Sequence, residues 1–457
     1  MELALRAGAA KVDISPPLGT IINGDFITHY AKYVHDSLYA KAVVLQNEHI
    51  QIAIVVVDIC VMTKDFLDEI KTEISIKTSI ELNNILISST HTHFAGSVAP
   101  LLLVAADLPY RQLLPGLILK AVQQAQENCM PAKIAFGVID VPEHVVCRRY
   151  FMKEAYAAYN PVSGGFDKVK TNPFGDESMI VKRVSQVDTG LNYLAIRALD
   201  NQWISVLANY SMHYVGDCKP GTITADYFGV FARHIASKLN AGDDFVGIMS
   251  NGTSGEASIW DFIDRDRYPK GDFEKSGLIG KDLAEKVFQS VKDVTWEQNP
   301  LLSVHYEEVK VGIRKPSSDE LKAAIKTVSE TDFENCKIYD DLGVMKEDLQ
   351  KLYAREQVLL NEYPDTILFP VQTIKIGTGI IGGLGGEFFA ETGLWLKEKA
   401  GNKYFTICMA NGYIGYVPPK HEIELGGYET WRCRSSFLEL KAENSIRDKL
   451  WEMIQRF

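Results

Sequence analysis

Residues 38–60 read LYAKAVVLQNEHIQIAIVVVDIC and form the most strongly patterned stretch of the chain. An apolar run, a polar turn (QNEH) and a continuous β-branched run follow one another, which predicts two adjacent strands buried on both faces. Residues 64–79 (KDFLDEIKTEISIKTS) have helical spacing, and residues 83–93 (NNILISSTHTH) read as a further buried strand that ends in polar residues. This order predicts an α/β fold in which layered, mixed β-sheets are flanked by helices.

The same alternation continues to the last residues. Residues 115–129 (PGLILKAVQQAQENC) predict an amphipathic helix, and the pairs of apolar runs after them predict further strands. Residues 316–362 differ, since they are charged and helical with few β-branched runs. We expect them to form a helical excursion packed on the α/β body, within a single domain over residues 1–457.

Composition limits the classes of function. The chain of 457 residues has a formal net charge of −11 and no basic stripe, which excludes a nucleic-acid partner. Its start carries an acid at position 2 and no uninterrupted apolar stretch of signal-peptide length, and no segment reaches the roughly 20 apolar residues of a membrane span. Seven cysteines form no CxxC pair, which is typical of free thiols in a reducing compartment, with Cys60 the clearest core case. We expect a cytoplasmic protein with a small-molecule partner and no membrane; a homo-oligomer is compatible with the sequence.

Histidines stand at the ends of two predicted strands. His91 and His93, in STHTH, are two residues apart, so on a strand they would point to opposite faces, but a turn at the strand end would let one bind a metal while the other works beside it. A polar strand terminus with hydrogen-bonded histidines explains the pair equally well. A single histidine such as His213, in ANYSMH, is more typical of a structural role than of a metal ligand. The metal-ligand interpretation of His213 is strengthened because His91 also stands at the end of a strand.

Two glycine-rich segments and a tyrosine-rich one follow. Residues 250–258 (SNGTSGEAS) permit close backbone approach to a ligand but match neither a nucleophile elbow nor a phosphate-binding loop, so a tight turn is favoured. Glu387 comes directly after GGLGG, where a carboxylate can reach a cleft as ligand or base; the overlapping G-x-G-x-x-G lacks the following helix and ribose-binding acid of a dinucleotide site. Residues 411–432 (NGYIGYVPPKHEIELGGYETWR) usually indicate packing, although a metal can bind a tyrosine as phenolate.

Taken together, these segments resemble the neutral/alkaline ceramidase family along nearly the whole chain. The opening AGAAKVDISPPLG is similar to the family's start, STHTH to its HTHSGP element, and ANYSMH to its second strand-borne histidine. SNGTSGEAS stands where the family has a Gly-Asp-x-Ser-Pro turn, LGGEFF where it has Gly-Glu-Phe, and NGYIGYVPP with GGYE where it has its closing tyrosines. The shared order and spacing of these elements are more specific than any one of them.

The resemblance implies a metal site and the residues that work around it. It assigns His91, His213, Glu387 and Tyr416 as ligands of zinc or another divalent metal. It further assigns catalytic roles to four residues, with Arg149 as the alternative to the arginine: His93, Arg148, Ser258 and Tyr428.

Several departures from the family's pattern limit what carries over. Phe94 follows His93 where the family has Ser-Gly-Pro, and the Gly-Glu-Ala-Ser turn lacks the proline, which puts the role of Ser258 in doubt. We expect no counterpart of the family's C-terminal β-sandwich domain. We therefore expect a zinc-dependent hydrolase of an amide or ester bond in a small polar molecule, for which N-acylated and sugar-derived compounds are the candidates; ceramide itself is not the expected substrate. The alternatives are a metal-dependent glycoside-cleaving or sugar-converting enzyme on the same scaffold and a non-catalytic ligand-binding homologue.

Overall fold

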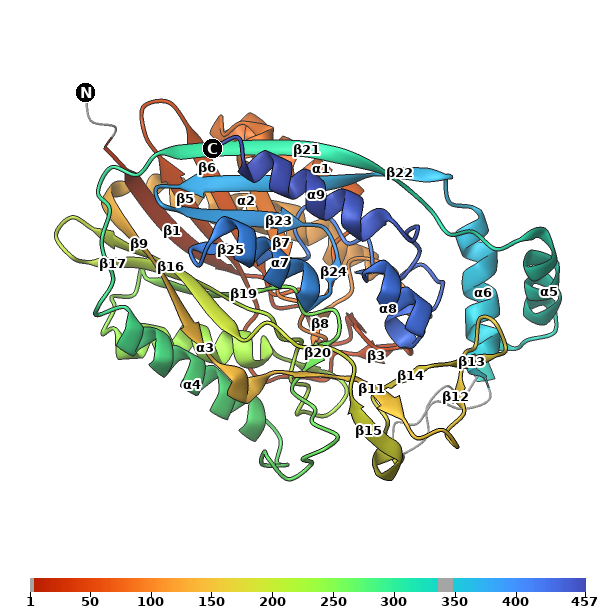
Figure 1. Cartoon of the computed structure of the whole chain (residues 1–457). Helices are drawn as coiled ribbons and strands as arrows, with labels where there is room; N and C mark the ends of the chain where they lie inside the picture. Colours follow the sequence, from red (N-terminus) through yellow and green to blue (C-terminus); the bar gives the residue numbers. More distant parts are fainter. Residues whose placement is uncertain (1–3, 336–347) are drawn as a thin grey trace.

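The computed structural model describes residues 4–335 and 348–457, and its centre is an eight-stranded mixed sheet (Figure 1). The predicted pair in residues 38–60 is confirmed, because Tyr39–Gln46 (β5) and Gln51–Val57 (β6) pair antiparallel around the polar turn. β6 then pairs parallel with Ile85–Ser89 (β7). The sheet runs in the order β19-β17-β16-β9-β1-β5-β6-β7; the other strands are β1 (Arg6–Asp13), β9 (Met130–Asp140), β16 (Gly190–Ala198), β17 (Trp203–Tyr210) and β19 (Val246–Asn251).

A second, four-stranded sheet packs against one face of the first. Alternate residues of β6 explain why: Ile54 and Val56 belong to a buried cluster that also contains Ile374 and Phe405 of the second sheet, whereas Val55 faces a different cluster of helix residues. Both faces of β6 are therefore buried, as its continuous apolar sequence predicts. The second sheet has the order β21-β22-β23-β25, with bounds Leu302–Gly312 (β21), Thr366–Ile376 (β22), Gly379–Leu384 (β23) and Tyr404–Ile407 (β25).

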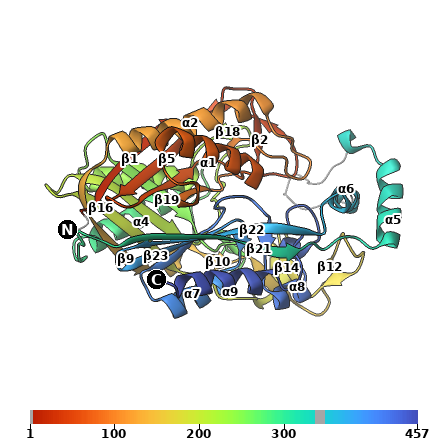
Figure 2. The same cartoon turned by 90° about the horizontal axis from the view of Figure 1, so that it is seen from above.

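Helices cover the outer faces of both sheets, which gives four layers in the order helices, sheet, sheet, helices (Figure 2). On the large sheet lie α1 (Lys64–Thr78), α2 (Leu108–Glu127), α3 (Asp226–Lys238) and α4 (Glu274–Ser290). On the smaller sheet lie α7 (Ala390–Ala400) and α9 (Ala442–Ile454). The predicted α/β class with layered mixed sheets and flanking helices is confirmed.

Helix α2 begins earlier than the predicted start at Pro115. It starts at Leu108, because the Asp107 side chain caps it by accepting a hydrogen bond of 3.1 Å from the Tyr110 N–H. Pro109 fits in the first turn, where no intrahelical donor is needed. The apolar spacing alone therefore locates the end of this helix better than its beginning.

The predicted excursion is helical where the structure describes it; residues 336–347 of the predicted range lie outside the description. Ser318–Ser329 (α5) and Leu349–Asn361 (α6) stand at one end of the molecule (Figures 1 and 2). Leu352 and Tyr353 of α6 are fully buried in a cluster with Trp431. The excursion thus packs on the body beside the segment that carries the last tyrosine of the candidate site.

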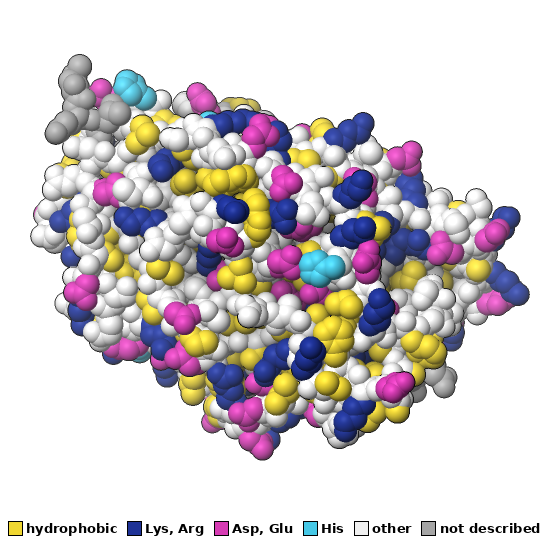
Figure 3. Space-filling view, in the orientation of Figure 1, with side chains coloured by type: hydrophobic (Ala, Val, Ile, Leu, Met, Phe, Trp, Pro, Cys, Tyr) yellow, Lys and Arg dark blue, Asp and Glu magenta, His cyan; other side chains and the backbone are white. Residues whose placement is uncertain are grey.

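The surface and the helices agree with the composition. Figure 3 shows acidic and basic side chains interspersed over one face of the molecule, without a continuous basic patch. Over residues 4–335 and 348–457, every helix falls short of the length and apolarity that crossing a lipid bilayer requires.

Candidate metal centre

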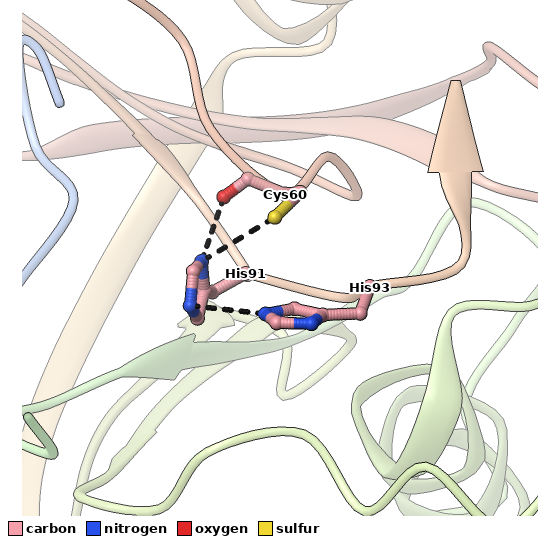
Figure 4. A group of neighbouring side chains, drawn as sticks. All are labelled: Cys60, His91 and His93. Atoms are coloured by element: carbon pink, nitrogen blue, oxygen red, sulfur yellow. Dashed lines mark hydrogen bonds between the residues drawn. The ribbon is translucent and has the colours of Figure 1, made fainter. Parts of the chain in front are cut away.

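His91 and His93 follow β7 at the point where the chain leaves the sheet (Figure 4). His91 has a left-handed backbone conformation with φ 69°, and its Nε2 lies 3.3 Å from Nε2 of His93. Its other nitrogen, Nδ1, lies 2.9 Å from the carbonyl oxygen of Cys60 and 3.7 Å from the Cys60 sulfur. Because a carbonyl oxygen only accepts, Nδ1 donates to it, and Nε2 is the nitrogen that can hold a metal ion or a proton.

Glu387 brings a carboxylate to this free nitrogen. Its Oε2 lies 3.5 Å from His91 Nε2 and 3.0 Å from His213 Nε2, and its Oε1 accepts a hydrogen bond of 2.9 Å from the Tyr413 hydroxyl. The exposed fractions are 3% for His91, 2% for His213 and 4% for Glu387. Their ligand atoms lie within 4.8 Å of one another, so three residues from distant segments converge on one buried point.

The charges around this point favour a cation. A lone-pair nitrogen and a carboxylate oxygen that face each other repel unless a positive charge lies between them. Burial opposes the charge of both groups, yet Glu387 and Cys60 hold the pKa of His91 well above its ordinary value, and the histidines hold the pKa of Glu387 well below its ordinary value. The positive charge between them is therefore a proton on His91 Nε2 or a metal ion that takes its place. Burial and the charge of Arg148 lower the pKa of His213 to about 4, which keeps this imidazole in the neutral form that binds metals.

The donor set fits a divalent metal ion such as zinc. Two imidazoles and one carboxylate with room for a further ligand are the usual protein share of such a site. The Cys60 carbonyl orients His91 in the way that outer partners orient metal-bound histidines. His213 differs, because its buried Nδ1 has no hydrogen-bond partner among the described residues. Cys60, His91 and His93 form a second cluster of ligand atoms, which shares His91 with the first.

Tyr416 lies beside Glu387 because two short strands pair there. Glu387–Phe388 (β24) and Tyr416–Val417 (β26) pair parallel, with Glu387 opposite Tyr416 in the register. Burial and the Glu387 charge hold the pKa of Tyr416 well above its ordinary value, while Arg148 opposes them. The Tyr428 ring stands 5.7 Å from the Tyr416 ring, so both predicted tyrosines belong to this neighbourhood.

The two adjacent arginines point to different partners. Arg148 Nη2 donates to the Tyr416 hydroxyl at 3.0 Å, whereas Arg149 is fully buried against Glu422 and Glu429 at 2.9 and 3.0 Å. Arg148 is therefore the arginine that reaches the site, and Arg149 is part of a buried ionic network. This geometry separates two candidates that the sequence leaves open.

His93 is packed tightly between aromatic and backbone groups. Its ring stacks on Tyr214 at a centroid distance of 3.7 Å, and Gly24 approaches it so closely that an added Cβ would lie 2.6 Å from the His93 Cβ. Burial and the neighbouring His91 hold the pKa of His93 well below its ordinary value. His93 is thus a neutral, immobilised imidazole next to the ligand cluster.

Ser258 stands on the strand pair next to Arg148, and its role stays a prediction. Ala257–Ser258 (β20) pairs with Val146–Cys147 (β10), and the Ser258 hydroxyl oxygen accepts a hydrogen bond of 3.1 Å from the Trp260 N–H. The turn before it packs on the glutamate strand, where the Gly255 N–H donates to the Phe388 carbonyl at 2.8 Å. Gly255 therefore serves a close backbone approach to β24, where an added Cβ would lie 2.7 Å from the Glu387 carbonyl oxygen.

Three neighbours of the cluster were given no role from the sequence, although Tyr413 lies in the tyrosine-rich segment. Tyr413 fixes Glu387, Tyr214 supports His93, and Glu429 holds both arginines. Each is adjacent or nearly adjacent in sequence to a predicted site residue, which was the available signal. Their partners come from distant segments, which spacing does not reveal.

No family model matches the chain, and no curated protein matches it by sequence. Solved structures match its fold, and two of them are ceramidases. A ceramidase complexed with C2 has a TM-score of 0.72 at 14% identity, over 99% of this chain and 75% of that one. Neutral ceramidase from Pseudomonas aeruginosa has a TM-score of 0.69 at 14% identity, over 99% of this chain and 74% of that one. The chain therefore has the fold of the neutral ceramidases along nearly its whole length.

Proposed function

We propose that this protein is a zinc-dependent hydrolase that cleaves an amide or ester bond in a small polar, N-acylated or sugar-derived substrate. The observation that carries the proposal is the convergence of His91, His213 and Glu387 at a buried point that favours a cation, with His93 beside it. Tyr416 is the proposed fourth ligand. When bound, zinc would lower the pKa of a water molecule and polarise a carbonyl group.

The chain's own residues supply proton transfer and charge stabilisation. His93 lies beside the ligand cluster, so its imidazole can take a proton from a nucleophile and return it to a leaving amine or alcohol. Arg148 and Tyr428 are donors for the negative charge that develops on the substrate carbonyl oxygen, an effect worth about 3–4 kcal/mol for one well-placed donor. Tyr413 and the Cys60 carbonyl keep Glu387 and His91 in fixed orientations.

The surroundings of His93 support a polar substrate. The Asp25 carboxylate and His29 Nε2 lie 2.8 Å apart next to Gly24, and Arg148 brings a positive charge to the cluster. The solved structures of similar fold are named ceramidases. A hydrolase of that fold with these polar groups near its proposed base is suited to an acyl group on an amino sugar or a similar polar amine.

The test combines metal analysis with hydrolysis of a panel of N-acyl amino sugars, N-acyl amino acids, ceramide and plain glycosides. We expect about one zinc per chain, release of a carboxylic acid from a polar N-acyl compound, and loss of both in His213→Ala. His144→Ala is the matched control, because His144 is also buried but bonds to Tyr268 and Asp282.

Three results would contradict the proposal. Wild-type protein without metal affinity would remove its basis. Cleavage of glycosides alone would favour sugar conversion, and zinc binding without turnover of any compound would favour a binding protein.

A further inference from the structure

A buried carboxylate joins the two adjacent arginines behind the candidate centre. Glu429 is fully buried and comes directly after Tyr428. Its Oε1 accepts a hydrogen bond of 2.8 Å from Arg148 Nε, and its Oε2 accepts bonds of 3.0 Å from Arg149 Nη1 and 2.7 Å from the Thr171 hydroxyl. Glu429 therefore bonds at the same time to the arginine that reaches Tyr416 and to the one that does not.

The far end of this network is anchored by a second carboxylate. Arg149 Nη2 donates to Glu422 Oε2 at 2.9 Å and to the Glu422 carbonyl at 3.2 Å. Two arginines and two glutamates make the network electrically neutral, which is the condition under which buried charges are tolerated. Burial opposes the charge of Glu429, but Arg148 and Arg149 outweigh it and hold the pKa of Glu429 below its ordinary value.

The near end of the network is the side chain of Arg148. Nε is held by Glu429, and Nη2 donates to the Gly255 carbonyl at 2.8 Å and to the Tyr416 hydroxyl at 3.0 Å. Nη1 has no acceptor among residues 4–335 and 348–457. The guanidinium plane is thus fixed on two sides while one donor nitrogen is left for another molecule.

We propose that Glu429 is a positioning residue for the reaction: it holds the Arg148 guanidinium in the plane from which Nη2 bonds to Tyr416 and Nη1 is presented to the substrate. The inference rests on the proposed function. Glu422 supports the same network through Arg149 and has no bond to Arg148. The two glutamates therefore share burial and charge but differ in whether they orient Arg148.

The experiment compares Glu429→Gln with the matched control Glu422→Gln in the full chain. The first readout is kcat on the polar N-acyl compound that the wild type cleaves best; the second is the visible spectrum of Co²⁺-loaded protein, which reports coordination geometry without turnover. We expect kcat to fall on the order of 10²-fold in Glu429→Gln, since an error of about 1 Å in a positioning group has that effect. We also expect its Co²⁺ spectrum to change, while Glu422→Gln keeps the wild-type spectrum and loses less than about tenfold.

A double-mutant cycle shows whether Glu429 acts through Arg148. Glu429→Gln should lower kcat strongly in the wild type and very little in an Arg148→Met background. If Glu429→Gln fails to fold, Thr171→Val takes its place in the cycle, because it removes one hydrogen bond to Glu429 without changing any charge. We expect Thr171→Val to lower kcat several-fold in the wild type and to have no such effect in the Arg148→Met background.

The outcomes separate the two proposals. Wild-type protein that takes up no Co²⁺ and hydrolyses nothing overturns the proposed function and this inference with it. Wild-type protein that binds and hydrolyses, while the two glutamine variants lose activity equally or the cycle is additive, overturns the role of Glu429 alone.

Discussion

Substitution of Gly24 by alanine tests whether the position of His93 matters for turnover. The new Cβ would lie 2.6 Å from the His93 Cβ and 2.7 Å from its Nδ1. Ordinary contact begins at 3.4 Å, so the distance between the two Cβ atoms is about 0.8 Å too short. Rotation of the imidazole does not relieve this overlap, because the Cβ position is set by the backbone. The two segments must therefore separate, and a displacement of this size at a catalytic group lowers kcat by on the order of 10²-fold.

Gly19→Ala is the matched control for backbone strain. Gly19 has φ +91° and Gly24 has φ +116°, so alanine is strained at both, by about 1–2 kcal/mol, but a Cβ at Gly19 would meet nothing within 4 Å. Thermal unfolding should show a loss of stability in both variants, and the loss should be larger in Gly24→Ala because its Cβ also overlaps His93. Zinc content should stay at the wild-type level in both. Steady-state hydrolysis of a polar N-acyl compound should be impaired in Gly24→Ala alone. Equal kcat values in the two variants would refute the role of His93 in proton transfer.

Three further substitutions test one support of the site and two buried charged groups of the fold. Tyr413→Phe removes the hydrogen bond to Glu387 and should weaken zinc affinity by about 10- to 100-fold in chelator competition; unchanged affinity would separate Tyr413 from the site. Lys41→Met leaves the fully buried Asp58 unpaired and should lower the free energy of unfolding by about 3–5 kcal/mol in urea melts, whereas a loss below 1 kcal/mol would show that the pair is dispensable. Burial raises the pKa of Asp226 to about 6, so near pH 5 the folded state holds a proton that the unfolded state has released. The free energy of unfolding of the wild type should therefore fall by about 1 kcal/mol from pH 5 to pH 7 relative to that of Asp226→Asn. A difference between the two proteins that does not change with pH would contradict this.

Much of the fold follows from local pattern. The continuous apolar run of β6 predicts a strand buried on both faces, and the helical spacing after it predicts α1, because each signal lies within a few adjacent residues. The start of α2 was missed because its signal is a single cap, Asp107, followed by a proline that reads as a loop. A capping signal of one residue is weaker than the apolar spacing, and that spacing begins only several residues later.

The site was only partly predictable. His91 and His213 end buried strands, a position where ligand groups collect, so residue type and place both pointed to them. Tyr416 could be predicted only from the family resemblance. It lies beside Glu387 because two strands of two residues each pair there, and such short strands leave no periodic pattern in the sequence. Glu429 was missed for the same reason: its two arginine partners lie about 280 residues earlier in the chain.

The central claim is that one metal ion binds where His91, His213 and Glu387 converge. The most direct test is a crystal of the protein grown with zinc and measured on both sides of the zinc absorption edge. We predict one anomalous peak per chain within bonding distance of these three residues and of the Tyr416 hydroxyl, with one coordination position left for water. An anomalous map without a peak at that point, from a crystal in which the four side chains are ordered, would contradict the account.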